Sequence, residues 1–462
     1  MKHVVPAVDE PLWREIAYGD PALMLRRFAG VKDLTFLDSA LQQGELGRYS
    51  YIAADPFETF AVTEGESGAA ALARLDRRLE RWRLARIPGL PPFQGGFAGY
   101  FAYEFARLLE PNVMAKTPPP GIPPVALHAY DTIVAFDHQA KQCWIISTGF
   151  PETGRDARFA RAGERLAQFE SLCLRPVPEL AGGRIIESWQ SNFTRDAYEA
   201  AVQRTIDYVL AGDIFQANVS QRFSATLPAN FNPLSHYLAL RESNPATFGA
   251  FLDYGAVKIA SSSPERLIGF DGTTAEARPI KGTRRRDADA GIDAELKAEL
   301  LASRKDRAEN VMIVDLLRND LSRVCEPGTV QVPMLCGLES YASVHHLTSI
   351  VTGRLARGKS RGDLIAACFP GGSITGAPKI RAQEIIAEIE RLPRNIYCGS
   401  IGFLSFTGHM DLNIAIRTVL FHDGRASFQG GGGITAKSLP ADEYEETLAK
   451  VNRIARSFAG AP

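Results

Sequence analysis

The chain has 462 residues, a formal net charge of −1 at pH 7, 45% hydrophobic residues and 23% charged residues. These values are typical of a folded globular protein, and they argue against both the strong basic field of many nucleic-acid-binding proteins and the charge excess of disordered chains. Apolar runs stay shorter than the ~20 residues of a membrane-spanning helix, and the N-terminus lacks the apolar core of a signal peptide. We therefore expect a cytoplasmic protein whose partners include neither nucleic acid nor a membrane.

In chain order, residues 1–180 form a first region in which short β-like runs alternate with turns rich in Pro and Gly. A basic, helix-like stretch at residues 69–85 interrupts these runs. The polar segment at about 175–194 contains several Pro and Gly residues and is typical of a crossing connection. The second region covers residues 190–460, and we expect the two regions to pack closely against each other.

The second region opens with the clearest helix of the chain. Thr194 is a candidate N-cap, apolar residues follow it at helical spacing, and Gly212 ends the pattern. No repeat of 20–50 residues is visible. Further helices are expected at 294–321 and 378–392, and further strands at 399–406, 412–420 and 426–429. The mixture indicates an α+β fold with large sheets rather than repeating βαβ units.

Six scattered cysteines form no Cys-x-x-Cys pair, which suits a reducing compartment and disfavours a zinc site. Carboxylates are the better metal ligands here. Asp306 and Glu309 share one helix face at a spacing of three, and so do Glu443 and Glu446. Two such faces brought together would form an oxygen-only site suited to Mg2+, a hard cation that keeps several waters. On spacing alone, however, the better interpretation is that these carboxylates are ordinary solvent-exposed residues on the surface of a helix.

Two glycine-rich segments could bind an anion. Residues 369–379 lead into a helix, where free N–H groups and the helix dipole favour negative charge, although a structural turn is an equally good interpretation. Gly430–Gly433 follow a strand and could hold a carboxylate through successive N–H groups, with a flexible loop as the alternative.

Two basic residues also stand out. Arg417, on an otherwise apolar strand, requires an anionic partner, which is either a substrate or a buried carboxylate. Lys281, which precedes a glycine, could act as a nucleophile if desolvation and neighbouring positive charge lower its pKa from the usual value of about 10.4. A solvated lysine in a basic turn is the plainer interpretation of Lys281.

Taken in order, these segments resemble the chorismate-utilising enzymes, the family of anthranilate synthase, aminodeoxychorismate synthase, isochorismate synthase and salicylate synthase. The resemblance runs from about residue 194 to 450 and is looser before that. Its motifs are Gly212–Asn218, Ser261–Arg266, Pro279–Arg284, Asp306–Val324, His346–Ser349, Gly371–Arg381, Tyr397–Gly402, Ile416–Thr418 and Gly430–Lys450. The family implies an α+β sandwich of two large antiparallel sheets with helices outside, and an active site between the sheets.

Lys281 points to one branch of this family. Aminodeoxychorismate synthases carry lysine in the Pro-x-x-Gly-Thr motif, where the other branches usually carry alanine. Asn218 and the segment Gly-Ser-Ile-Thr-Gly-Ala-Pro-Lys are similar to the same branch. The resemblance therefore implies amination of chorismate to 4-amino-4-deoxychorismate, on the route to para-aminobenzoate and folate. The alternatives are anthranilate synthase component I and, from a different class, a non-catalytic regulatory subunit that binds chorismate or tryptophan.

The resemblance also implies a role for each site residue. Glu309 and Glu446 would bind Mg2+, supported by Asp306 and Glu443. Lys281 would form a covalent adduct at C2 of the ring, Glu265 would be the acid–base group, and His346 would orient the substrate or transfer a proton unless it is structural. The expected substrate-binding residues are Arg417, Tyr397, Gly431, Gly432, Gly433, Thr375, Gly282, Thr283 and Lys450.

The expected partners follow from a motif that the sequence lacks and from four residues that resemble a ligand pocket. No Gly-x-Cys-x-Gly nucleophile elbow is present, so a separate glutaminase subunit, in a heterodimer, would supply ammonia. Asp38, Ser39, Asn244 and Pro245 resemble the family's tryptophan pocket, which makes bound tryptophan a further candidate ligand. Residues 244–248, Asn-Pro-Ala-Thr-Phe, depart from the Asn-Pro-Ser-Pro-Tyr of inhibited enzymes, and this argues against allosteric control by tryptophan.

Overall fold

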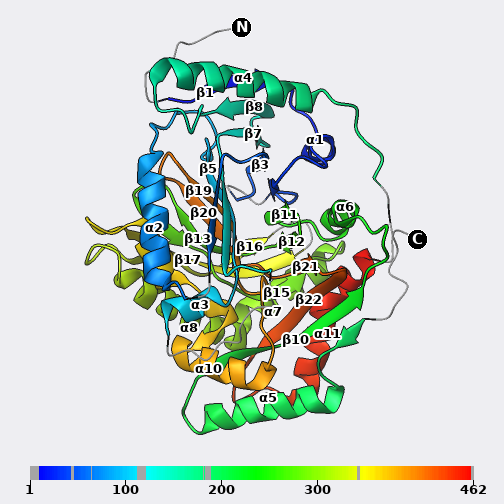
Figure 1. Cartoon of the computed structure of the whole chain (residues 1–462). Coiled ribbons are helices and arrows are strands. Elements are labelled where there is room, and N and C mark those ends of the chain that lie inside the picture. Colours follow the sequence, from blue (N-terminus) through cyan, green and yellow to red (C-terminus); the bar gives the residue numbers. More distant parts are fainter. Residues whose placement is uncertain are drawn as a thin grey trace.

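A computed structural model describes residues 10–458 except 43–45, 64, 112–120, 181, 183–188 and 341–343. Within these residues, two large antiparallel sheets pack face to face and helices cover their outer faces (Figure 1). The predicted α+β sandwich is confirmed. In the described part of the chain, no helix is both long and apolar enough to cross a membrane.

The first sheet has twelve strands among the described residues, and strands from both regions of the chain contribute to it. Its order is β1 (Leu12–Ile16), β8 (Gln142–Ser147), β7 (Thr132–Asp137), β3 (Tyr49–Ala53), β2 (Leu34–Asp38), β11 (Phe248–Tyr254), β12 (Val257–Ser263), β21 (Thr418–His422), β22 (Arg425–Ile434), β10 (Gln216–Thr226) and β18 (Gly376–Ala377), with β9 (Gln190–Ser191) also on β10.

The second sheet has ten described strands and mixes the two regions in the same way. Its order is β15 (Ile280–Arg285), β17 (Val344–Arg354), β14 (Thr274–Ala277), β13 (Arg266–Phe270), β20 (Met410–Asn413), β19 (Ser400–Ser405), β5 (Gly96–Phe101), β6 (Val125–Tyr130) and β4 (Glu58–Val62), with β16 (Gln331–Ser340) also on β17.

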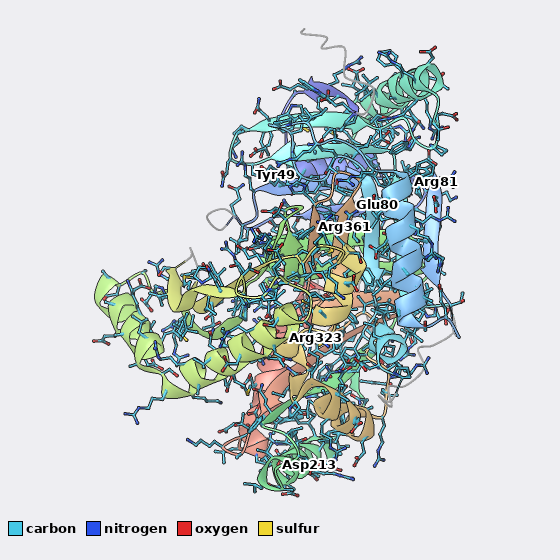
Figure 2. The ribbon with its side chains drawn as sticks, turned by 90° about the vertical axis from the view of Figure 1, so that its left-hand side faces the viewer. Tyr49, Glu80, Arg81, Asp213, Arg323 and Arg361 are labelled. Atoms are coloured by element: carbon cyan, nitrogen blue, oxygen red, sulfur yellow. The ribbon has the colours of Figure 1, made fainter. Side chains whose placement is uncertain are left out.

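The helices shield the outer faces and one end of the sandwich (Figure 1). They are α1 (Pro21–Arg27), α2 (Gly68–Arg81), α3 (Phe105–Leu109), α4 (Arg155–Cys173), α5 (Arg195–Leu210), α6 (Pro233–Ser243), α7 (Ala290–Ala302), α8 (Arg304–Ser322), α9 (Arg361–Cys368), α10 (Lys379–Glu390) and α11 (Pro440–Ser457). A view turned by 90° places Tyr49 toward one end of the molecule, Arg323 near its middle and Asp213 at the other end (Figure 2).

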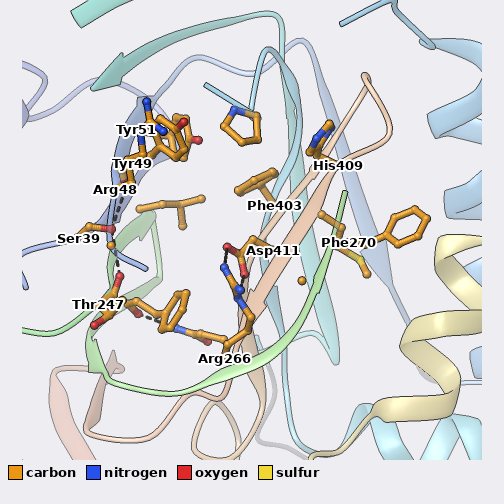
Figure 3. Close-up of a pocket in the computed structure, with 18 of the residues that line it drawn as sticks. Ser39, Arg48, Tyr49, Tyr51, Thr247, Arg266, Phe270, Phe403, His409 and Asp411 are labelled. Atoms are coloured by element: carbon orange, nitrogen blue, oxygen red, sulfur yellow. Dashed lines mark hydrogen bonds and ion pairs between the residues drawn. The ribbon is translucent and has the colours of Figure 1, made fainter. Parts of the chain in front are cut away.

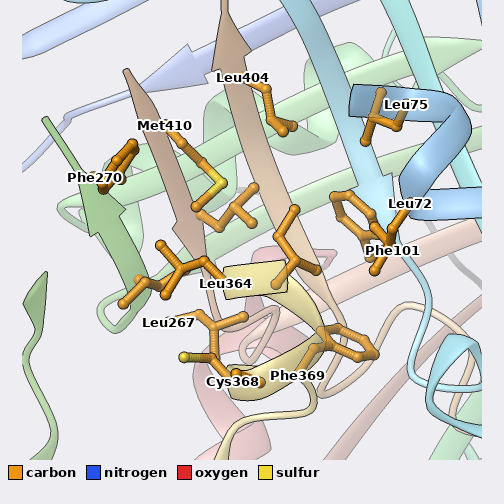
Figure 4. Packing of buried hydrophobic residues seen from close by; sticks show 14 of the residues in the cluster. Leu72, Leu75, Phe101, Leu267, Phe270, Leu364, Cys368, Phe369, Leu404 and Met410 are labelled. Carbon is orange, nitrogen blue, oxygen red and sulfur yellow. The ribbon is translucent and has the colours of Figure 1, made fainter. Parts of the chain in front are cut away.

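The hydrophobic core has layers inside and outside the sandwich. Between the sheets, Tyr51 and Ile133 of the first sheet pack with Phe403 and Tyr130 of the second. Outside the second sheet, Leu72 and Leu75 of α2, Leu364 and Cys368 of α9, and Leu404 and Met410 of the sheet belong to one cluster (Figure 4). The burial of these side chains fixes the sheets and helices that position the candidate site.

Several predicted elements have different ends in the structure. Thr194 caps α5 as predicted, by accepting a hydrogen bond from the Ala197 N–H. The helix predicted at 294–321 is instead two helices, because Ser303 ends α7 and its side chain caps α8. The strand predicted at 412–420 was also wrong, because Asn413 ends β20 and Thr418 begins β21. Part of the predicted crossing segment, residues 181 and 183–188, lies outside the described residues.

Candidate active site

Lys281 lies on β15 at an irregularity in its pairing with β17. The register shifts between Lys281 and Thr283, and Gly282 has a φ of +80°, in the left-handed region that favours glycine. A Cβ atom on Gly282 would lie 2.8 Å from the Cβ of Asp306. Glycine at this position therefore lets helix α8, which carries two of the four predicted metal ligands, pack directly against the strand that carries the lysine.

A serine joins the lysine to the predicted acid–base group. The Nζ of Lys281 donates to the carbonyl oxygen of Ser373 at 3.3 Å, and the Ser373 hydroxyl donates to Oε1 of Glu265 at 2.8 Å. Burial raises the pKa of Glu265, although the charge of Lys281 and the bond from Ser373 oppose the rise. The structure thus brings Lys281 and Glu265 together, with a carboxyl group that holds its proton more firmly than usual.

His346 lies on β17 opposite Thr283. Its Nδ1 is 2.8 Å from the Thr283 hydroxyl, and its side chain is buried. Burial and the positive charge of Arg417 lower the pKa of His346 to about 4. The imidazole is therefore neutral at pH 7, so it can orient a polar group or accept a proton but adds no positive charge.

The two predicted acidic faces meet across α8 and α11. Burial raises the pKa of Glu309, and the charge of Glu446 adds to the rise. The pKa of Glu446 is lowered despite its burial, because Lys450 lies 2.6 Å away and Lys305 and Lys281 are also near. Burial and the charge of Glu446 raise the pKa of Glu443. A cluster of carboxylates and lysines therefore lies beside Lys281.

Asp306, the fourth predicted metal ligand, lies on α8 beside strand β15. It packs against Gly282 and pairs with Arg284 at 3.6 Å, while its charge contributes to the raised pKa of Glu309. Among the described residues, no three acidic, His or Cys side chains are close enough to hold a metal by themselves. Any ion here would need further ligands from water or substrate, which is how Mg2+ is usually bound.

The glycine run, Gly430–Gly433, belongs to strand β22 rather than to a loop. On the facing strand β10, the N–H of Asn218 donates to Thr375 and the N–H of Ser220 donates to Glu390, so neither bonds to β22. Their partners in register, Gly433 and Gly431, therefore direct their N–H groups away from β10. Beyond residue 428 no described strand covers that edge of β22.

The neighbours of the glycine run explain why larger residues are absent from it. A Cβ atom on Gly432 would lie 2.8 Å from Oε2 of Glu443, and one on Gly433 would lie 1.8 Å from Nε2 of Gln216. The carbonyl oxygen of Gly431 accepts a bond of 2.8 Å from Lys450. The glycines thus let α11 and the Gln216 side chain approach the strand on its two faces.

Arg417 lies in the connection between β20 and β21, at a φ of +52°, and not on a strand as predicted. Arg417 is exposed to solvent, although many protein atoms lie around its guanidinium. Burial and the charge of Arg453 lower its pKa. The guanidinium forms no hydrogen bond or ion pair with the described residues, so it is available to an anionic ligand.

The segment 369–379 is largely buried, and its side chains bond within the protein. Thr375, a predicted substrate-binding residue, donates its hydroxyl to the carbonyl oxygen of Gly371 at 2.9 Å. Lys379 donates to Asp320 of α8 at 2.6 Å. This favours the interpretation as a structural turn, which presents Ser373 to Glu265 and Lys281.

The sequence did not single out Ser373, Gln216 or Arg394 as functional residues. Gln216 is buried, and its amide oxygen has no hydrogen-bond donor among the described residues. Arg394 is also buried, in an ion pair with Glu390. Tyr397, which was predicted, is buried with its ring 5.6 Å from the Arg394 guanidinium. A buried arginine is rare enough to be a signal, but burial at this position is not readable from local sequence.

A separate cavity of about 330 Å³ lies between the two sheets (Figure 3). Asp38 and Ser39 line it, together with Tyr49, Arg266 and Phe403, whereas Asn244 and Pro245 do not. The Asp38 carboxylate is already bonded to Tyr237 and Arg241. Two of the four residues predicted for a tryptophan pocket thus face this cavity, which includes none of Lys281, Glu265 and His346.

Comparison with known proteins agrees with the fold. Residues 36–456 match the model of the chorismate binding enzyme family, and the chain belongs to that family. It is 37% identical to aminodeoxychorismate synthase component 1 of Escherichia coli, over 99% of this chain and 100% of that protein. It is 39% identical to anthranilate synthase component 1 of Streptomyces coelicolor, over 97% of this chain and 87% of that protein.

Solved structures lead to the same conclusion. Anthranilate synthase component I from Streptococcus pneumoniae superposes with a TM-score of 0.78 at 31% identity, covering 90% of this chain and 94% of that one. The menaquinone-specific isochorismate synthase from E. coli shares the fold, with a TM-score of 0.73 at 18% identity over 98% of this chain and 95% of that one. The chain is therefore a chorismate-utilising synthase of the component 1 type.

Proposed function

We propose that the chain is the synthase subunit of an aminodeoxychorismate synthase, which converts chorismate and ammonia to 4-amino-4-deoxychorismate for para-aminobenzoate and folate biosynthesis. The observation that carries this proposal is the amine of Lys281 held beside a buried carboxyl group, Glu265, through Ser373. An alanine at this position could not act as a nucleophile, and lysine is the residue that distinguishes this branch of the family.

The charged groups of the site suit the two carboxylates of chorismate. Arg417, without a partner among the described residues, and the outward N–H groups of Gly431 and Gly433 would bind the carboxylate of the enolpyruvyl group. Tyr397, Thr283, Gly282 and Lys450 would complete the substrate-binding site. Glu309 and Glu446 of α8 and α11 fit Mg2+, because a hard cation would relieve the repulsion between the two carboxylates. The ion would neutralise the ring carboxylate.

The proposed first step forms a covalent adduct. The neutral amine of Lys281 bonds to C2, the ring double bond shifts, and the C4 hydroxyl leaves as water with a proton from Glu265. Glu265 then regains a proton from the lysine nitrogen. The raised pKa of Glu265 suits this role, because the group must begin protonated. Neutral His346 would orient the ring or its carboxylate.

The second step releases the lysine. Ammonia bonds to C4, the double bond shifts back, and the bond between C2 and the lysine nitrogen breaks as Glu265 returns a proton to that nitrogen. Glu265 then takes a proton from the new ammonium group. The sum is chorismate plus ammonia giving 4-amino-4-deoxychorismate plus water. The ammonia would come from a separate glutaminase subunit in a heterodimer, consistent with the component 1 names of the relatives.

Anthranilate synthase is the second candidate, since relatives of that name are as similar to this chain as those named aminodeoxychorismate synthase. The test uses the purified chain with chorismate, Mg2+ and ammonium chloride, without glutaminase. We expect a non-fluorescent product of the mass of aminodeoxychorismate, which added lyase converts to 4-aminobenzoate and which K281A does not form. Direct formation of fluorescent anthranilate would establish the second candidate. Binding of chorismate or tryptophan without turnover would establish the regulatory subunit.

A further inference from the structure

Arg394 is a fully enclosed charged residue in the connection between α10 and β19. Only 2% of its surface is exposed. Its guanidinium forms a two-pronged ion pair with Glu390, with Nε–Oε2 and Nη2–Oε1 distances of 2.9 and 2.7 Å. Its backbone is held as well, because the N–H donates to Glu104 at 2.7 Å and the carbonyl accepts from Gln429 at 3.1 Å.

The remaining donors of the guanidinium reach two backbone carbonyls of the candidate site. Nη1 donates to Ile374 at 3.0 Å, and Nη2 donates to Asn218 at 2.6 Å. Ile374 lies between Ser373 and Thr375. Asn218 belongs to β10, and its N–H donates to Thr375 at 2.7 Å. Arg394 therefore holds the turn that presents Ser373 and the strand beside the glycine run in one arrangement.

We infer that Arg394 is a positioning residue of the active site, which acts on Lys281 and Glu265 through the Ile374 carbonyl and Ser373. The path has three links: Arg394 fixes Ile374, the chain joins Ile374 to the preceding residue, Ser373, and Ser373 bonds both Lys281 and Glu265. The kinetic part of this inference rests on the proposed function.

The geometry requires an arginine in particular. A guanidinium presents five N–H donors in one rigid plane and can serve a carboxylate and two carbonyls at the same time. A lysine ammonium keeps the charge, and so keeps Glu390 paired, but its three donors cannot reproduce the planar fork. R394K therefore separates the positioning of Ser373 from the neutralisation of Glu390.

The chain provides a matched control in Arg165 of α4. This arginine is also buried and multiply bonded, to Asp131, Asp55 and Gln168. None of those residues belongs to the candidate site. R165K thus imposes the same chemical change on a similar network elsewhere in the molecule.

The experiment compares R394K, R165K and the unchanged chain in the ammonia-dependent reaction, with thermal unfolding recorded for each. For R394K we expect kcat to fall at least tenfold, with KM for chorismate changed less than threefold. The limb of the pH profile where Glu265 loses its proton should also move. R165K should keep kcat within twofold. The inference is overturned if R394K keeps kcat within twofold, or if R165K loses as much as R394K.

Three further measurements cover the remaining outcomes. If Arg394 acts through Ser373, the loss of kcat in R394K/S373A must be smaller than the product of the two single losses, whereas independent effects would multiply and contradict the path.

If R394K does not fold, R394M/E390Q removes both charges together and is assayed instead, with the same criterion for kcat. If the unchanged chain forms no aminated product, the proposed function fails, and Arg394 is then tested through chorismate affinity in the presence of Mg2+, which R394K should weaken and R165K should not.

Discussion

The hydroxyl of Ser373 donates a hydrogen bond of 2.8 Å to Glu265, and the carbonyl of the same serine accepts one of 3.3 Å from Lys281. One residue of a buried turn thus contacts both reacting groups of the proposed mechanism. Because the serine lies on a different segment from either partner, its position sets the separation between the amine and the carboxyl group.

Replacing Ser373 should therefore change the pH dependence as well as the rate. S373A removes a hydrogen bond that lowers the pKa of Glu265, so this pKa should rise further. Because Glu265 must begin protonated, the decrease of kcat at high pH should shift to a higher pH. We also expect kcat at its maximum to be about tenfold lower, as for the loss of one well-placed hydrogen bond. Rate–pH profiles measure both effects. S400A is the control, because the buried Ser400 hydroxyl has no partner among the described residues. A pH profile that does not move in S373A would contradict the role of Glu265 as the acid–base group.

Metal binding should depend on Glu309 and Glu446. We expect E309Q and E446Q each to raise the Mg2+ concentration needed for half-maximal activity by at least tenfold, because each removes one of the few charged ligands of a hard cation. EDTA should abolish turnover, and added Mg2+ should restore it. E445Q is the matched control on the same helix, where Glu445 pairs with Arg195 at the surface. Full activity of the unchanged chain in EDTA would refute the magnesium proposal.

Arg417 should contribute to substrate affinity without contributing much to stability. Its guanidinium has no ion pair with the described residues, so R417K leaves no carboxylate unpaired and should change the unfolding midpoint little. Loss of a two-pronged bond to a carboxylate costs about 1.5–3 kcal/mol, so KM for chorismate should rise roughly 10- to 100-fold. R266M provides the contrast, since Arg266 pairs with Asp411 and Glu276 and its loss should lower the midpoint. An unchanged KM in R417K would show that the carboxylate binds elsewhere.

Glu104 should make the protein less stable as pH rises. Burial raises its pKa to about 7, although its carboxylate accepts bonds from the N–H groups of Arg394 and Asn395. Below about pH 4.5 the folded and unfolded states both hold this proton. As pH rises to 7, the unfolded state loses the proton first, so the free energy of unfolding falls, by about 3 kcal/mol at most for this group, and then stays level.

The measurement is urea unfolding of the unchanged chain and of E104Q at pH 5 and pH 7.5. E104Q keeps an oxygen acceptor but cannot ionise, so its loss of stability between the two pH values should be smaller. Equal losses in the two proteins would show that Glu104 does not titrate in this range.

Local patterns predicted elements better than they predicted contacts. Thr194 and the apolar spacing after it placed α5 correctly because capping and amphipathicity are local properties. The break at Ser303 was missed although its signal is local too, because the Ser303 side chain accepts a hydrogen bond from the Asp306 N–H and so caps α8. The interruption before Thr418 was missed for a different reason. Arg417 adopts a left-handed conformation that its side chain does not favour and that only tertiary contacts can hold.

The candidate site shows the same division. Spacing paired Asp306 with Glu309 and Glu443 with Glu446, but no local pattern could show that α8 and α11 bring Glu309 and Glu446 together. Family resemblance supplied that expectation, and it also named Lys281 and Glu265. It did not supply Ser373 or Arg394. Lys281 contacts the Ser373 carbonyl, and Arg394 contacts the carbonyls of Ile374 and Asn218, and such backbone contacts leave little trace in side-chain chemistry.

The interleaving of strands from the two regions has a consequence for how this protein is made. Strand β5, Gly96–Phe101, pairs with β19, Ser400–Ser405, and β2 pairs with β11, so both sheets join early and late parts of the chain. Pairings between residues so distant in sequence form slowly, because long loops must close first. Neither sheet can be completed until most of the polypeptide has left the ribosome. The early strands must therefore persist with unpaired edges during synthesis, a state in which they depend on chaperones or rapid completion to avoid aggregation.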